Sequence, residues 1–120
     1  MSFYETHELH RKEELRTRWY QGSYDEMKKA IFAVADYLGY GVYDCNDTYQ
    51  EFLLEGPASL VIKVCSYGRF EHGVDFNITT RSFFDFGKGK RMITQFYDAL
   101  GKHIRFKGVS LHPWLKRLSY

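Results

Sequence analysis

A short segment near residue 90 combines the residue types that most readily bind anions. The segment from Gly87 to Arg91 (GKGKR) follows an aromatic run and precedes an apolar pattern with helical spacing. Backbone N–H groups at a helix start, with Lys and Arg beside them, form a site for anions, and glycine lets a phosphate approach closely. Cations at a helix N-terminus oppose the helix dipole, which also favours an anionic partner. The candidate anion-binding residues are Arg81, Lys88, Lys90 and Arg91.

The same segment departs from the known phosphate-binding fingerprints. A dinucleotide-binding G-x-G-x-x-G motif needs glycine at position 92, where this chain has Met92. A P-loop needs Ser or Thr directly after Gly-Lys, and Gly89 and Arg91 stand at those positions. The alternative interpretation is a polar, flexible start of a helix that binds no ligand, and the sequence leaves both interpretations open.

Other residues with metal-binding or catalytic chemistry lack a specific pattern. His7, His10 and Glu13 are spaced i, i+3, i+6, which on a helix would place them roughly on one side. This spacing is weak support for zinc, because an exposed charged arm also contains histidine by chance. We therefore predict neither a metal site nor a cofactor.

The two cysteines give no better case for catalysis. Cys45 is flanked by Asp44 and Asp47, and neighbouring acids raise the pKa of a thiol rather than activate it. Cys65 lies in an apolar strand pattern, where a cysteine is usually an inert small hydrophobic residue. We expect both thiols to be buried and reduced. Since sequence spacing shows no converging carboxylates either, we predict that the protein is not an enzyme.

The C-terminal segment has the pattern of a short basic amphipathic helix. Its apolar residues recur at i, i+3, i+4 and i+7: Leu111, Trp114, Leu115 and Leu118. Pro113 suits a first helical turn, and Lys116 and Arg117 lie off the apolar stripe. Such a segment folds back on its own domain, docks on another protein or rests at a membrane surface. We predict that these four residues form an interface with protein.

Two helices and a run of strands must position these residues. Ser23 and Glu26 form a capping box before a helix over residues 24–38, and Gly39 ends it. A second helix begins after Gly87 and carries the stripe Ile93, Phe96, Tyr97 and Leu100. Strand patterns cover residues 15–20, 42–45, 49–54, 60–67 and 74–81.

The expected fold is an α+β two-layer sandwich. An antiparallel sheet of four to five strands has two helices on one face, in the order β-α-β-β-β-β-α. This order resembles the topology of TATA-box-binding-protein-like folds and, more loosely, helix-grip folds. The resemblance lies in element order alone and assigns no family.

The chain of 120 residues predicts one core with short extensions at both ends. We divide it into a charged N-terminal arm (1–14), an α+β domain (15–108) and an amphipathic tail (109–120). The N-terminus turns charged at once and no apolar run approaches the length of a membrane span, which predicts a cytoplasmic protein without a transmembrane segment.

Charge is sorted along the chain. Residues 81–120 carry a local net charge of +7, and residues 41–80 carry −4. Such opposite fields act on encounter and partner choice rather than on the fold. They favour a non-enzymatic binding or assembly domain that forms a homo-oligomer or contacts a protein partner. Two alternatives stay open: binding of nucleic acid or another polyanion through the basic third, and a small-molecule pocket lined by Tyr and Phe between sheet and helices.

Overall fold

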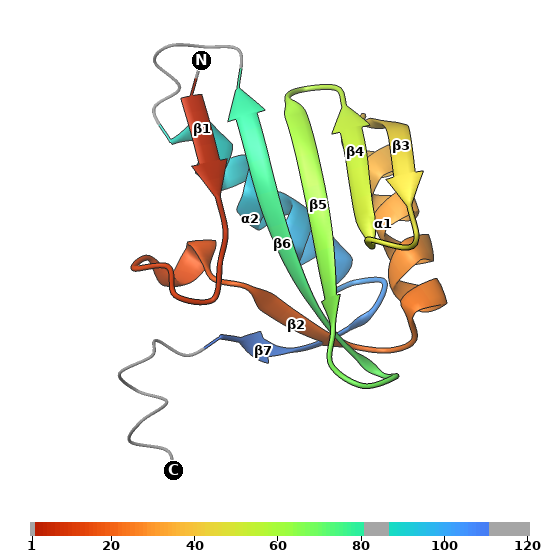
Figure 1. Ribbon diagram of the computed structural model, residues 1–120. Helices are drawn as coiled ribbons and strands as arrows, with labels where there is room; N and C mark the ends of the chain where they lie inside the picture. Colours follow the sequence, from red (N-terminus) through yellow and green to blue (C-terminus); the bar gives the residue numbers. More distant parts are fainter. Residues whose placement is uncertain (1, 81–86, 111–120) are drawn as a thin grey trace.

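A computed structural model describes residues 2–80 and 87–110 of the chain (Figure 1). The elements follow in the order β1 (Ser2–Glu5), the 3-10 helix η1 (Glu13–Leu15), β2 (Arg18–Gln21), α1 (Tyr24–Leu38), β3 (Gly41–Asn46), β4 (Glu51–Glu55), β5 (Ser59–Ser66), β6 (Glu71–Thr80), α2 (Lys88–Leu100) and β7 (Arg105–Val109). None of the helices within these ranges has the length and apolar character needed to cross a membrane.

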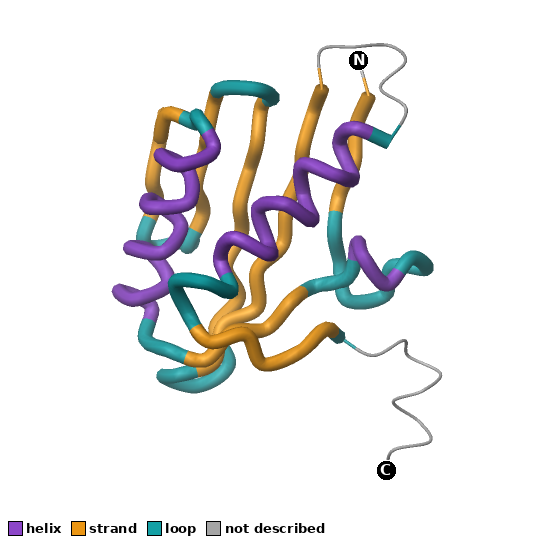
Figure 2. The backbone as a smooth tube through the Cα atoms, turned by 180° about the vertical axis from the view of Figure 1, so that it is seen from behind, coloured by secondary structure: helices purple, strands orange, loops and turns teal. Residues whose placement is uncertain are grey.

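The strands form one open, antiparallel sheet of seven strands in the order β3-β4-β5-β6-β2-β7, and β1 also pairs with β6. Both helices pack on the same face of this sheet, so the α+β two-layer class is confirmed (Figure 2). The expected four to five strands are too few. The sheet gains β1 and β7, which are short and charged and carry no apolar pattern that would reveal them.

The N-terminal region belongs to the sheet from its second residue. Ser2–Glu5 pairs with β6 in the register Phe3 to Thr79 and Glu5 to Asn77. The rest of the predicted charged arm (1–14) forms no long helix: the short helix η1 is the element described between β1 and β2. The sheet therefore starts well before the boundary at residue 15, and at the other end β7 runs to Val109.

Helix α1 forms as its sequence predicts. Ser23 Oγ accepts a hydrogen bond from Glu26 N at 3.1 Å, and Ser23 N donates to Glu26 Oε1 at 3.3 Å, which completes the capping box. Gly39 ends the helix with φ 85°, a left-handed conformation that glycine adopts without strain.

The core lies between the helices and the inner face of the sheet. The predicted stripe of α2 is buried, and so is that of α1 (Met27, Ala30, Ile31 and Val34) except for Leu38, which is partly buried. These residues meet β5 and β6 at Leu60, Ile62, Val64, Val74, Phe76 and Ile78. Rings pack on rings there: Phe76 lies 5.1 Å from Phe96 and 4.7 Å from Tyr97 between ring centroids. Val61, which the β-branched run of residues 60–67 would also assign to the core, lies instead on the other face of β5.

Candidate functional site

The cationic segment at the start of α2 is less open than its sequence suggested. Lys88 and Arg91 are exposed, but Lys90 is half-buried, with its Nζ 3.4 Å from Glu14 Oε1. Gly89 is buried, and a Cβ atom at this position would overlap the ring of Tyr4. This glycine thus lets a tyrosine from β1 pack on the helix, which is a structural reason for its presence. Arg81 lies outside the described residues.

The four predicted interface residues of the tail, Leu111, Trp114, Leu115 and Leu118, also lie outside the described residues. The last described residue is Ser110, whose amide donates to Thr17 O at 2.9 Å. Its hydroxyl accepts a hydrogen bond from Trp19 Nε1 at 2.8 Å. The chain therefore leaves the sheet beside β2.

The histidines of the N-terminal segment lie close together without helical structure. The ring centroids of His7 and His10 are 4.9 Å apart, and the bonded turn between them runs from His10 N to His7 O. Across residues 2–80 and 87–110, no group of three or more His, Cys, Asp or Glu side chains has a geometry that could hold a metal ion.

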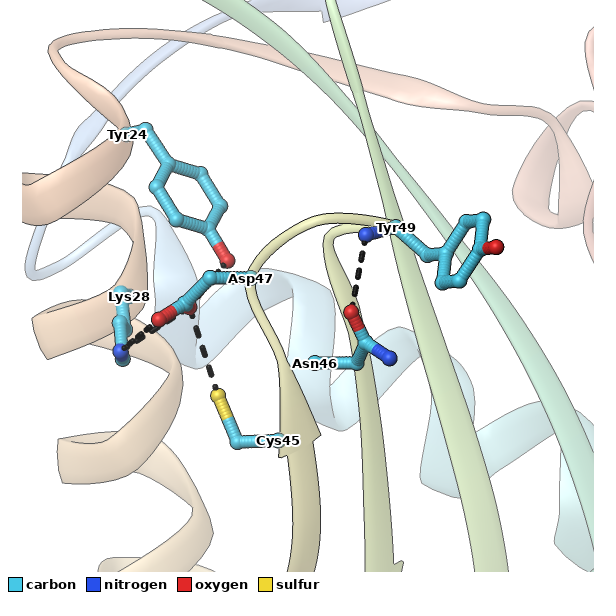
Figure 3. Close-up of polar contacts among 6 residues, drawn as sticks. All are labelled: Tyr24, Lys28, Cys45, Asn46, Asp47 and Tyr49. Carbon is cyan, nitrogen blue, oxygen red and sulfur yellow. Dashed lines mark hydrogen bonds and ion pairs between the residues drawn. The ribbon is translucent and has the colours of Figure 1, made fainter.

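A polar cluster joins the first turns of α1 to the β3–β4 turn (Figure 3). Asp47 Oδ1 accepts hydrogen bonds from Tyr24 OH at 2.9 Å and from Lys28 Nζ at 3.0 Å, and the thiol of Cys45 lies 3.6 Å from it. The lysine hydrogen bond lowers the pKa of Asp47. Desolvation raises the pKa of Cys45, so this thiol is not an activated nucleophile. The cluster fixes the turn, which Asn46 Oδ1 also stabilises by accepting from Tyr49 N at 3.0 Å.

A serine–histidine pair lies at the adjoining ends of β5 and β6. Ser66 and His72 face each other across the strands, with Ser66 Oγ 2.9 Å from His72 Nδ1. Ser66 Oγ also lies 3.0 Å from Gln50 Oε1. Burial lowers the pKa of His72, which keeps the ring neutral at pH 7. The pair has the contact of a nucleophile and a base, and cross-strand hydrogen bonding on a sheet produces the same contact. The other ring nitrogen, His72 Nε2, is buried without a hydrogen-bond partner among the described residues.

Within residues 2–80 and 87–110, no helix covers the face of the sheet opposite α1 and α2 (Figure 1). This face is rich in carboxylates. Strand alternation and register place the following carboxylates of β1, β3, β4 and β6 on it: Glu5, Asp44, Glu51, Glu55, Glu71 and Asp75. On the same face of the described β1, β3, β4, β5 and β6, Lys63 is the one basic side chain, while β7 brings Arg105 onto this face and Lys107 into an ion pair with Glu71. Most of the acidic charge of residues 41–80 is thus gathered on one surface, which we call the acidic face.

Apolar side chains interrupt the acidic face. Leu53 and Val61 are directly opposite each other on β4 and β5, and Leu53 is 37% exposed. Phe3 on β1 is 61% exposed and pairs with Thr79. Trp19 lies at the β2 side of the face, where its ring packs against Gly73. Apolar contacts flanked by charge are typical of protein-binding surfaces.

Asp75 is the most enclosed carboxylate on this face. Its Oδ1 accepts hydrogen bonds from Thr6 Oγ1 and Thr17 Oγ1, both at 2.7 Å. Thr6 Oγ1 in turn accepts from Phe76 N at 2.9 Å and lies 3.1 Å from the hydroxyl of Tyr97. Burial raises the pKa of Asp75, and the two threonine hydrogen bonds oppose this shift.

The position of Asp75 follows from the strand arrangement. β2 pairs with residues 71–74 of β6 and β1 pairs with residues 77–80, so residues 75 and 76 lie between the two partners. Beside this gap the acidic face holds a groove of about 270 Å³. Thr6, Glu51, Val61, Lys63, Asp75, Phe76 and Asn77 line it. The groove combines an apolar wall with both signs of charge.

Comparison of the chain with protein-family models, with curated proteins and with solved structures gives no match. The case for a site therefore depends on the geometry of this chain. Sequence reasoning recognised the acidic segment but not its concentration on one face. Alternation within β4 and β6 is the signal that could have located it, since every second residue shares a face.

Proposed function

We propose that the protein is a non-enzymatic protein-binding domain whose acidic face receives a cationic protein segment that also carries apolar side chains. The observation that carries the proposal is a set of six carboxylates, of which Glu71 is paired with Lys107, on the sheet face that also presents Leu53, Val61 and Phe3 and that no described helix covers. Opposite charge steers encounter and fixes orientation, while the apolar contacts supply burial.

Binding of a polyanion is the weaker alternative. The cationic segment of α2 lies on the helix side of the molecule. Lys90 pairs there with Glu14, and the ring of Tyr4 fills the space beside Gly89 that a bound phosphate would need. The acidic face would repel a phosphate backbone. A small-molecule pocket between sheet and helices has less support still, since Phe76, Phe96 and Tyr97 pack against one another there.

The proposal is tested with a fluorescent twelve-residue peptide of alternating Lys and Leu, and with a Glu and Leu counterpart. We expect the cationic peptide to bind and to shift backbone NMR signals of β4 and β5. Replacing Asp44, Glu51 and Glu55 together by Lys should weaken binding at least about tenfold and reduce its dependence on salt.

The matched control reverses charge on the helix side. Asp25 and Asp36 are exposed on α1, and replacing both by Lys should leave binding of the cationic peptide nearly unchanged. Equal binding of both peptides, or equal loss in the two sets of variants, would overturn the proposal.

A further inference from the structure

We infer that the groove beside Asp75 is a subsite for one lysine side chain of the bound protein segment, and that it selects lysine over arginine. This inference rests on the proposed function, since it names the residue type that the acidic face binds at one position. The groove, of about 270 Å³, offers an apolar wall for the methylene chain of a lysine and carboxylates for its ammonium group.

The carboxylate of Asp75 is held in one orientation by two buried hydroxyls. Thr6 is 5% exposed and Thr17 is 1% exposed, and both donate to Oδ1 of Asp75 at 2.7 Å. Phe76 N donates to Thr6 Oγ1 at 2.9 Å, so the proton of this hydroxyl is left for Asp75. The two hydroxyls use the acceptor sites of Oδ1, and Oδ2 remains as the acceptor for a ligand.

Asp75 also lacks a cationic partner within the part of the chain that the structure describes. Burial raises the pKa of this carboxyl, because its charged form is poorly solvated. Lys63 is its cross-strand neighbour on β5, yet no described basic side chain forms an ion pair with Asp75. An asparagine oxygen would accept the same two threonine bonds without a half-buried charge, so a bridge between strands does not require a carboxylate. A ligand ammonium group supplies the missing partner.

The charges around the groove favour a cation. Glu51 and Asp75 line the groove together with Lys63, and Glu51 is directly opposite Lys63 on the neighbouring strand. After the larger effect of burial, the negative charge of Glu8 also raises the pKa of Asp75, and His7 has a smaller, opposite effect. The acidic side chains thus outnumber Lys63 at this place.

The basic residues of β7 lie near the other end of β6. Arg105 pairs with Gln21 of β2, which pairs with Glu71, and Lys107 forms an ion pair with Glu71. Asp75 is four residues further along β6, or about 13 Å at about 3.3 Å per residue. This distance exceeds the screening length of about 8 Å at physiological salt. The two cations therefore act on Glu71 rather than on the groove.

The threonine pair decides between lysine and arginine. A guanidinium group binds a carboxylate best through two parallel hydrogen bonds, one to each oxygen. Both threonines already use Oδ1 of Asp75, so the guanidinium finds one free oxygen. A lysine ammonium is a compact charge with three donors, which can be divided among acceptors of the groove: Asp75 Oδ2, the Glu51 carboxylate and the Asn77 amide oxygen.

Two fluorescent peptides that differ only in their basic residue test the inference: the alternating Lys and Leu peptide described above and an Arg and Leu counterpart. The unmodified chain should bind the lysine peptide at least about fivefold more tightly than the arginine peptide. Asp75→Asn retains an acceptor for both threonines but removes the charge. It should weaken binding of the lysine peptide at least about fivefold, while the backbone NMR spectrum shows a retained fold.

Thr17 provides the specificity test. Thr17→Val removes one hydroxyl, so the carboxylate can turn both oxygens toward a guanidinium group, and the preference for lysine should fall to about twofold or less. Thr17→Ser keeps the hydroxyl and should keep the preference. Thr94→Val is the matched control, because the Thr94 hydroxyl bonds to carbonyls of its own helix on the other side of the sheet. Its loss should leave both affinities unchanged.

Equal affinity of the unmodified chain for the two peptides would overturn the inference. Unchanged binding of the lysine peptide by Asp75→Asn, or an unchanged preference in folded Thr17→Val, would also overturn it. In those cases the combined charge reversal at Asp44, Glu51 and Glu55 decides the proposed function separately, and that function stands if the reversal weakens binding. If neither peptide binds the chain, the proposed function and the lysine subsite fail together.

Discussion

The two faces of the sheet are built from alternate residues of the same strands, yet they differ in chemistry. On the helix side, β5 and β6 present Leu60, Ile62, Phe76 and Ile78, all nearly inaccessible to solvent. On the other side the same strands present Val61, Lys63, Asp75 and Asn77, which are half-buried or exposed. The difference teaches that the buried core depends on one face of each strand, so residues of the other face, where we propose recognition, can be changed at little cost to stability.

The largest expected effect is a difference in unfolding free energy between substitutions of two leucines that lie on opposite faces of the sheet. Leu100 of α2 is fully buried on the helix side, and Leu53 of β4 is 37% exposed on the acidic face. Leu100→Ala should lower the free energy of unfolding by about 2 to 5 kcal/mol, because it leaves a cavity. Leu53→Ala should cost about 1 kcal/mol or less. Urea unfolding measures both, and equal losses would show that the faces do not divide the roles.

The glycine beneath Tyr4 gives the next largest effect. Ala is the better helix former by about 1 kcal/mol, but its Cβ atom at position 89 would overlap the Tyr4 ring. Gly89→Ala should therefore destabilise by about 1 to 3 kcal/mol through overpacking. In a Tyr4→Ala background the same change should become neutral or stabilising, which a double-mutant cycle detects.

A glycine with free space around it is the control for that cycle. Gly108 in β7 has no atom within 4 Å of an added Cβ, so Gly108→Ala should not clash. If Gly89→Ala raises the thermal midpoint in the unmodified background, β1 does not pack on α2 as described.

A smaller, pH-dependent effect is expected at Asp75 on the acidic face. Burial raises the folded-state pKa of this carboxyl above its ordinary value of 3.8, so the folded protein holds the proton more tightly than the unfolded chain. Stability of the unmodified chain should then fall, relative to Asp75→Asn, as pH rises from about 3.8 to the raised pKa of Asp75 in the folded protein. Unfolding midpoints between pH 3.5 and 7 measure the difference. A difference that runs the other way would mean that the threonine hydrogen bonds outweigh desolvation.

The smallest effect concerns the two thiols, one on each side of the sheet. Cys65 is exposed, whereas Cys45 is partly buried and its pKa is raised by desolvation. Iodoacetamide at pH 8 should label Cys65 several-fold faster, since the thiolate is the reactive form. Peptide mapping after brief labelling gives the ratio. Faster labelling of Cys45 would contradict the placement of β3 beside α1.

The parts of the fold that were predicted from sequence are those with strong periodic patterns. Helices α1 and α2, with their buried stripes, and the inward residues of β6 are as expected, because burial imposes a regular spacing. Strands β1 and β7 have no such spacing, since a short strand beside an existing sheet needs only backbone hydrogen bonds. Cys65 was expected to be buried but is exposed. Its β-branched neighbours indicated a strand, but they did not show on which face of β5 the thiol lies.

The candidate site was harder to predict than the fold for a related reason. The glycines at the start of α2 suggested a bound phosphate, and only the three-dimensional packing shows that the Tyr4 ring needs the space at Gly89. Glu14 is far from Lys90 in sequence, so their ion pair was invisible. The uneven distribution of charge along the chain was visible in the sequence. The strand register is needed to show that the acidic residues lie on one face of the sheet.

The gap between β1 and β2 beside residues 75 and 76 of β6 also bears on the order of assembly. Strands β3 to β6 join neighbours in sequence through short turns, so their pairing closes small loops and forms early. β1 must find β6 across more than 70 residues, and β7 reaches β2 across a similar span. The hydrogen bonds to Asp75 come from Thr6, directly after β1, and from Thr17, directly before β2, so both donors depend on strands that pair with β6 over long sequence separations. We therefore expect the carboxylate of Asp75 to lose its water late in folding, when these two segments dock beside β6.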